Sequence, residues 1–135
     1  MKKFLLLSFI LVLFGSCSVD DNDQDYSLEI LPIESVDMPE SFTMGEVYPI
    51  TVTYLRPSNC HLFREFYYAK DNNTRTVAVI DYKFLKTDCE DLDNELVEAT
   101  FNFQPTSNGS YIFKFWQGED AEGEDQYLII EVPVN

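Results

Sequence analysis

Two acidic stretches of the sequence, residues 119–125 and 88–93, carry the side chains best suited to metal chemistry. Carboxylate oxygens are the usual ligands of Ca²⁺, which takes many of them and tolerates irregular geometry. Neither stretch has the EF-hand spacing, and an acidic loop is more often solvated surface. We expect a calcium site only if the two stretches converge in space, and no other cofactor. The candidate ligands are Glu119, Asp120, Glu122, Glu124 and Asp125, with Asp88, Glu90, Asp91 and Asp93 from the second stretch.

Two cysteines, Cys60 and Cys89, lie in the body of the chain. An even pair in an exported chain is most simply a disulfide, here closing a loop of about 30 residues and contributing on the order of 3 to 4 kcal/mol. Two free thiols or a metal pair is the alternative, but no second Cys or His stands at ligand spacing. We therefore predict a Cys60–Cys89 disulfide.

The only histidine, His61, does not form a recognisable nucleophile–base pattern with a serine and an acid. We expect it to be a surface residue of a strand. A carboxylate pair for glycoside hydrolysis is uninformative because acids are so abundant, and a small domain leaves little room for a deep pocket. The sequence favours a protein that is not an enzyme.

Aromatic side chains suggest a different kind of site, because exposed rings stack on sugars or anchor protein partners. Trp116 and Tyr67 are the candidates, with Arg64 as a hydrogen-bond donor to a ligand. Phe63, Tyr68 and Arg56 are further possibilities of the same kind. The alternative is that the rings form the core and the arginines pair with the surplus of carboxylates.

The N-terminus predicts export. Lys2 and Lys3 precede an apolar run, Phe4–Phe14, that is too short to span a membrane, so residues 1–16 read as a signal peptide. The following Gly15-Ser16-Cys17 resembles the lipobox of bacterial lipoproteins, in which the cysteine thiol takes a lipid anchor. Phe14 departs from the aliphatic residue usual at that position. A simple cleaved signal is the alternative.

Residues 17–26 are acidic and nearly devoid of apolar side chains, which predicts a disordered tether after Cys17. An acidic run there resembles the surface-export signal of lipoproteins from Bacteroidetes and flavobacteria. That resemblance implies an outer-membrane protein displayed on the cell surface. A plain spacer, with the protein facing the periplasm, is the alternative.

Net charge excludes one class of partner. Without residues 1–16, which hold Lys2 and Lys3, the basic residues fall from 9 to 7 against 24 acidic ones, a formal charge of −17. Nucleic-acid binding needs a surplus of Lys and Arg, so we expect no nucleic-acid partner. The chain should contact a membrane only through its lipid.

Residues 27–135 read as one all-β domain, because apolar residues alternate, turn signals recur about every 8 to 12 residues and no amphipathic helix appears. The pattern favours an immunoglobulin-like β-sandwich of about seven antiparallel strands. In that fold the disulfide loop and the 119–125 loop share the end where the first strand begins. The expected strands are seven, at residues 28–36, 46–55, 60–69, 76–82, 96–104, 111–116 and 127–132, with 60–69 central in its sheet.

Two resemblances bear on class. Asn108–Phe113 resembles the tyrosine corner of immunoglobulin-like domains, with Phe113 where antibody domains have cysteine. The mature chain resembles small flavobacterial lipoproteins of unknown function, in Thr53–Pro57 and Phe115–Gly118 for example. This resemblance implies a cellular location and a fold, and no catalytic activity. We expect a non-catalytic binding or structural module with a protein or glycan ligand. A carbohydrate-binding accessory of an uptake system and a periplasmic inhibitor or chaperone-like factor are the alternatives.

Overall fold

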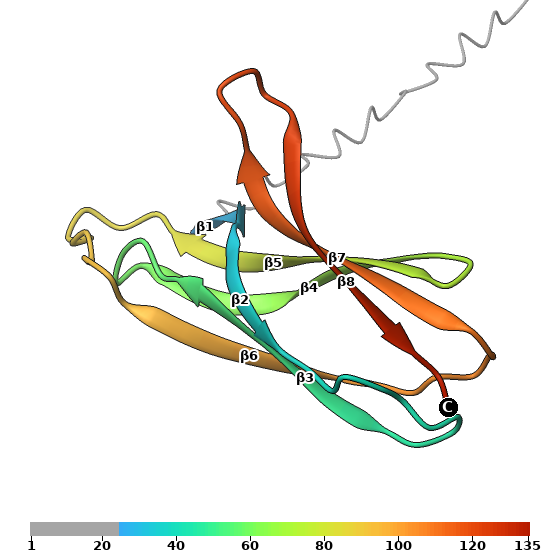
Figure 1. The fold of residues 1–135 in the computed structure, drawn as a ribbon. Coiled ribbons are helices and arrows are strands. Elements are labelled where there is room, and N and C mark those ends of the chain that lie inside the picture. The colour runs from blue at the N-terminus through green and yellow to red at the C-terminus, as the bar shows by residue number, and fades with distance from the viewer. Residues whose placement is uncertain (1–24) are drawn as a thin grey trace, which may run out of the picture.

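The computed structural model describes residues 25–135, so the predicted signal peptide, Cys17 and most of the acidic tether lie outside the described residues. No helix within this range is long and apolar enough to cross a membrane. The described chain is all-β (Figure 1). Its strands are β1 (Tyr26–Leu31), β2 (Ile33–Asp37), β3 (Tyr48–Leu55), β4 (His61–Asp71), β5 (Thr74–Phe84), β6 (Leu96–Phe103), β7 (Ser110–Glu119) and β8 (Asp125–Pro133).

The strands form two sheets that pack as a β-sandwich (Figure 1). In the five-stranded sheet, β5 pairs with β4 along one edge and with both β1 and β7 along the other, and β8 follows β7. The three-stranded sheet has the order β2-β3-β6. The β5–β7 pair is parallel and short, from Thr74↔Ile112 to Val77↔Phe115, whereas the other strand pairs are antiparallel.

Pro32 divides the first expected strand between the two sheets. β1 pairs with β5, whereas β2 pairs with β3. Proline has no backbone N–H to give to a ladder, so the pairing stops there and resumes on the other sheet. The prediction of one strand over 28–36 is therefore wrong, and residues 25–135 form eight strands where about seven were expected. Among these eight, the expectation of antiparallel strands fails at the β5–β7 pair alone.

The core lies between the sheets and follows the alternation that the sequence predicts. Inward residues of β3, β6 and β7 come at every second position, such as Ile50 and Val52 or Phe113 and Phe115. The buried core residues are Leu31, Ile33, Phe42, Ile50, Val52, Tyr54, Val77, Val79, Ala99, Phe103, Tyr111, Phe113, Phe115 and Val132.

Strand β4 lies at a different place in its sheet than expected, and its side chains do not alternate strictly. It pairs with β5 alone, so it is an edge strand and not a central one. A β-bulge between Phe63 and Glu65 shifts the register, and an extra residue reverses the facing of the residues after it. Phe63 and Phe66 therefore lie on one face, with ring centroids 5.1 Å apart, although strict alternation puts them on opposite faces.

The tyrosine corner is present. The backbone N–H groups of Thr106 and Ser107 donate to the Tyr111 hydroxyl at 3.1 and 3.2 Å. Asn73, in the β4–β5 turn, donates to the carbonyl of Asn108 at 3.4 Å, so the two turns share one end of the molecule. These bonds fix the entry of β7 beside the β4–β5 hairpin.

Candidate functional site

The two cysteines form the predicted disulfide. Cys60, directly before β4, is bonded to Cys89 in the loop between β5 and β6, with Cα atoms 5.6 Å apart. The neighbouring N–H of Leu85 donates to the carbonyl of Asp25 at 2.8 Å, so β1 begins beside this loop. The expectation that the chain enters the domain at the disulfide end is confirmed.

The two acidic loops do not meet. The β7–β8 tip projects away from the sandwich, and the β5–β6 loop lies at a different corner (Figure 1). Asp120 caps its own turn, accepting from the N–H groups of Glu122 and Glu124 at 2.8 and 3.0 Å. Within residues 25–135 no three His, Cys, Asp or Glu side chains are grouped to hold a metal. The convergence on which the calcium prediction depends is absent, so we do not pursue that prediction.

His61 is buried, contrary to the expectation of a surface residue. It is 3% exposed and its ring joins two elements. Nδ1 lies 2.6 Å from Oγ of Ser58, and Nε2 lies 2.7 Å from Oε2 of Glu29 on β1. The tautomer protonated on Nε2 fits both bonds, donating to Glu29 and accepting from Ser58. The sequence hides this cluster because Glu29 stands far from His61 in the chain.

Serine, histidine and carboxylate in hydrogen-bonded sequence are also the components of a nucleophile triad. A nucleophile must be approached by its substrate, whereas Ser58 is 6% exposed. Its oxygen also accepts a 3.1 Å bond from the N–H of Cys60. The arrangement ties β1 to the turn that precedes β4 and carries the disulfide, and we assign it a structural role.

The outer face of the five-stranded sheet carries a groove of about 300 Å³, which we call the Trp116 groove. It brings together two of the three predicted binding residues, Tyr67 and Trp116. The lining residues are Ile30, Tyr67, Thr76, Ala78, Trp116, Glu119, Asp125 and Tyr127.

Strand pairing explains the shape of the Trp116 groove. Tyr67 on β4 lies opposite Ala78 on β5, and Trp116 on β7 lies opposite Tyr127 on β8. Thr76 and Ala78 are small, so β5 forms a low floor between rings on its two neighbours. With adjacent strands about 4.8 Å apart, the backbones that carry Tyr67 and Trp116 are roughly 10 Å apart. This width suits one flat ligand between the rings.

Polar contacts hold the rings of the Trp116 groove in place. Nε1 of Trp116 donates to Oδ1 of Asp125 at 2.9 Å. Nζ of Lys114 lies 4.3 Å from the ring centroid of Tyr127, a cation–π contact. Burial, followed by the Asp125 charge, raises the pKa of Tyr127 and keeps its hydroxyl protonated. Tyr67 is 49% exposed and available for contact.

The predicted arginines lie elsewhere. Arg64 pairs with Glu65 at 3.2 Å, and its Cζ is 5.7 Å from the Tyr82 ring centroid, so it does not line the Trp116 groove. Arg56 donates to the carbonyls of His61 and Asn59 at 2.7 and 3.2 Å. Both side chains are bound within the chain.

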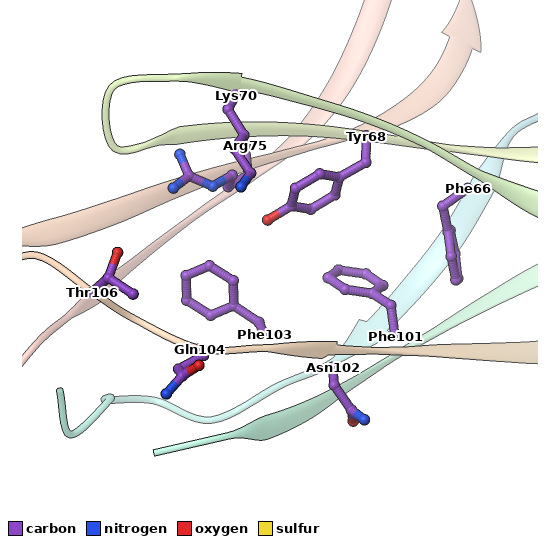
Figure 2. A pocket seen from close by; sticks show the side chains of 9 residues that line it. All are labelled: Phe66, Tyr68, Lys70, Arg75, Phe101, Asn102, Phe103, Gln104 and Thr106. Atoms are coloured by element: carbon purple, nitrogen blue, oxygen red, sulfur yellow. The ribbon is translucent and has the colours of Figure 1, made fainter. Parts of the chain in front are cut away.

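A second hollow, of about 450 Å³, lies between β4 and β5 of one sheet and β6 of the other (Figure 2). We call it the Arg75 cavity. The guanidinium of Arg75 and the hydroxyl of Tyr68 point into it from above, and Phe101 and Phe103 line it from below (Figure 2). Its lining residues are Phe66, Tyr68, Lys70, Arg75, Phe101, Asn102, Phe103, Gln104 and Thr106.

Sequence reasoning missed Arg75 and Asp81, the two buried ionisable residues of β5. Arg75 is 8% exposed and Asp81 is 0% exposed. A signal was available: Arg75, Val77, Val79 and Asp81 follow one another at every second position, so the alternation that buries the valines also buries the charges. An ionisable residue that falls at the same alternate positions as a run of buried residues is therefore predicted to be buried.

Fold and hollows together define an all-β protein of two packed sheets with an outer aromatic groove and a cationic inner cavity. Comparison of the chain with protein-family models, curated proteins and solved structures finds no match.

Proposed function

We propose that the protein is a lipid-anchored, non-catalytic binding module of the cell envelope, and that it binds a neutral glycan in the Trp116 groove. The observation that carries this proposal is the placement of Tyr67 and Trp116 on either side of a floor of small residues. The other features of the groove fit the same ligand class.

Sugars offer an apolar C–H face that packs on aromatic rings and hydroxyl groups that need acceptors. The Trp116 groove has both, since Glu119 and Asp125 lie beside the rings. Trp116 is held by its bond to Asp125, so little side-chain freedom is lost when a ligand binds. A fixed ring of this kind supports sugar binding more than an adaptable protein contact.

The expected ligand is uncharged. The two carboxylates in the groove repel an anionic sugar, and the whole chain carries a formal charge of −15. Polyanionic glycans are therefore disfavoured at this face. Neutral oligosaccharides of hexoses or pentoses are the class that the groove suits.

The proposed cellular location rests on the N-terminal sequence. We propose that Cys17 carries the lipid and that the acidic tether directs the protein to the outer-membrane surface, with the periplasmic face as the alternative. The tyrosine corner supports an immunoglobulin-like sandwich. The parallel β5–β7 pair would make it a variant of that fold, because immunoglobulin domains place the third strand beside the sixth.

Binding is tested on an array of neutral and acidic oligosaccharides. We expect signal from neutral glycans only, lost in Trp116→Ala and weakened in Tyr67→Ala. Tyr68→Ala is the matched control, because Tyr68 lies on the same strand but lines the Arg75 cavity. Equal binding by Trp116→Ala would rule out this groove as the site.

Location is tested by protease treatment of intact cells. Loss of the domain before outer-membrane permeabilisation supports surface display, provided that the purified domain is cleaved under the same conditions. Survival until permeabilisation supports the periplasmic face. A Cys17→Ala variant should leave the membrane fraction in either case, and its retention there would contradict lipid anchoring.

A further inference from the structure

We propose that the Arg75 cavity binds a carboxylate that is carried next to an apolar or aromatic group. This site is separate from the Trp116 groove, and the inference does not depend on glycan binding. It is carried by a buried guanidinium whose hydrogen-bonding capacity is only partly used.

The Arg75 side chain is fixed but unsatisfied. Nη1 donates to the carbonyls of Asn72 and Thr74 at 2.5 and 3.0 Å. Nε is buried and has no hydrogen-bond partner among residues 25–135, and both backbone carbonyls are bound through Nη1 alone. Unpaired donors of a buried cation are costly, and native structures rarely leave them so. A guanidinium with unused donors is a preferred partner of a carboxylate, which accepts charge-assisted hydrogen bonds from it.

The protein's own acids do not satisfy this cation. The chain has 24 acidic residues, yet the ion pairs of residues 25–135 include neither Arg75 nor Lys70. Lys70 lies opposite Arg75 in the β4–β5 register and lines the same cavity. Two cations without a carboxylate therefore face one cavity in a strongly acidic protein, which is the charge arrangement that an anionic ligand would complete.

Aromatic rings form the rest of the cavity. Phe66 and Tyr68 approach Phe101 with centroids 5.0 and 5.8 Å apart, which closes one end. Cζ of Arg75 lies 6.0 Å from the Phe103 centroid and 5.2 Å from that of Tyr111, so the guanidinium is held in place by cation–π contacts. An apolar or aromatic group on the ligand would pack against Phe101 and Phe103.

Tyr68 adds a second donor. Its hydroxyl points toward Arg75 across the cavity (Figure 2). Burial raises the pKa of Tyr68, and the charge of Arg75 and a hydrogen bond from its guanidinium offset part of the rise, so the hydroxyl keeps its own proton to donate. A carboxylate between these two side chains would accept from both.

A single carboxylate suits the cavity better than a doubly charged phosphate or sulfate. The net charge of −15 repels each ligand charge, and only Arg75 is buried enough to act without strong screening. The chemistry has two sources, a free aromatic acid and the C-terminal residue of a peptide. Since β4 and β6 are both edge strands, a peptide would have unpaired backbone groups beside the cavity.

The test needs no variant. The purified protein is titrated with N-acetylphenylalanine, with its amide N-acetylphenylalaninamide and with inorganic phosphate, and binding is followed by NMR. We expect saturable binding of the acid, with the amide and phosphate each weaker by about tenfold or more. Equal binding of acid and amide, tighter binding of phosphate, or no saturable binding of the acid would overturn the proposal.

Variants then locate the site. Arg75→Gln should abolish acid binding, and Lys70→Gln should weaken it less, because Lys70 is exposed. If Arg75→Gln does not fold, the acid-to-amide ratio of the unmodified protein still decides. Trp116→Ala should bind the acid normally, which separates this site from the glycan groove. Loss of acid binding in Trp116→Ala would count against the Arg75 cavity as the site.

A longer peptide ending in phenylalanine that binds more tightly than the single residue identifies a peptide source, and equal affinity identifies a free acid.

Discussion

The hydroxyl of Tyr54 donates a 3.0 Å hydrogen bond to Oδ1 of Asp81, and this bond joins the two sheets through the core. Oδ2 of Asp81 has no hydrogen-bond partner among residues 25–135. Burial raises the pKa of this carboxyl, and the Tyr54 bond and the nearby His61 and Arg56 offset only part of the rise. The core therefore favours the protonated form of Asp81.

Replacing Asp81 by asparagine should stabilise the protein at neutral pH. The folded-state pKa is raised, so the stability that comes from the protonated carboxyl is present below the unfolded pKa of about 3.9 and is lost as the pH rises through the folded value. The asparagine amide would keep an acceptor for Tyr54 and carry no charge. Denaturant unfolding across pH should show Asp81→Asn ahead by about 1 kcal/mol at neutral pH and level with wild type in acid. A wild-type advantage at neutral pH would contradict this reading.

Removal of the Tyr111 hydroxyl should loosen the turn before β7. Tyr111→Phe loses the bonds that the N–H groups of Thr106 and Ser107 donate and the bond with the Ser107 hydroxyl, and it leaves part-buried N–H groups unpaired, so we expect a loss of about 1 to 3 kcal/mol in the free energy of unfolding. Urea unfolding at neutral pH measures it. A change smaller than about 0.5 kcal/mol would show that the corner contributes little.

The same tyrosine gives a test in alkaline solution. Burial tends to raise the pKa of Tyr111, but the hydrogen bonds from Ser107 and Thr106 outweigh it and lower the pKa to about 8. Stability from the ionised form is therefore present above the unfolded pKa of about 10 and is lost as pH falls through about 8. The gap between wild type and Tyr111→Phe should widen over this range, while ultraviolet absorbance reports the ionisation. A constant gap would contradict the lowered pKa.

The disulfide should matter for stability. Cys60→Ser with Cys89→Ser removes a crosslink between residues 29 positions apart and should lower the free energy of unfolding by about 2 to 4 kcal/mol. Calorimetry should give the double variant and the reduced wild type the same lowered melting temperature. An unchanged melting temperature in both would show that the link is dispensable.

Local patterns in the sequence predicted the faces of β3, β6 and β7, because alternation is imposed by the strand itself. Alternation does not give the faces of Phe63 and Phe66 correctly, because a bulge between Phe63 and Glu65 shifts the register of β4. The sequence did not predict that the chain changes sheets at Pro32. A proline interrupts a strand pattern but does not show which strand the chain pairs with next.

In the candidate sites, too, local sequence identified single residues but not their arrangement in space. Tyr67 and Trp116 were identifiable as candidates, but that they meet across Ala78 depends on the β5–β7 pairing, which joins distant segments. The Arg75 cavity lies between two sheets, and a single sequence contains no direct signal for a gap between strands.

Ser58 should be unreactive despite its bond to His61. Its oxygen is buried and accepts from the N–H of Cys60, so a substrate has no approach to it. Incubation with a fluorophosphonate, followed by intact mass measurement, should give no adduct on the folded protein. A stoichiometric adduct on Ser58 that His61→Gln abolishes would reveal a nucleophile and contradict a purely structural role.

The most direct measurement uses Trp116, the single tryptophan of the chain, as a reporter in the proposed glycan site. Its fluorescence is followed while neutral cello-, xylo- and manno-oligosaccharides are added, with Tyr67→Ala as the weakened variant and Tyr68→Ala as the control. The account predicts a saturable change with at least one neutral oligosaccharide, shifted to higher concentration in Tyr67→Ala and unchanged in Tyr68→Ala. No saturable change with any of them, or the same titration in Tyr67→Ala, would contradict glycan binding in the Trp116 groove.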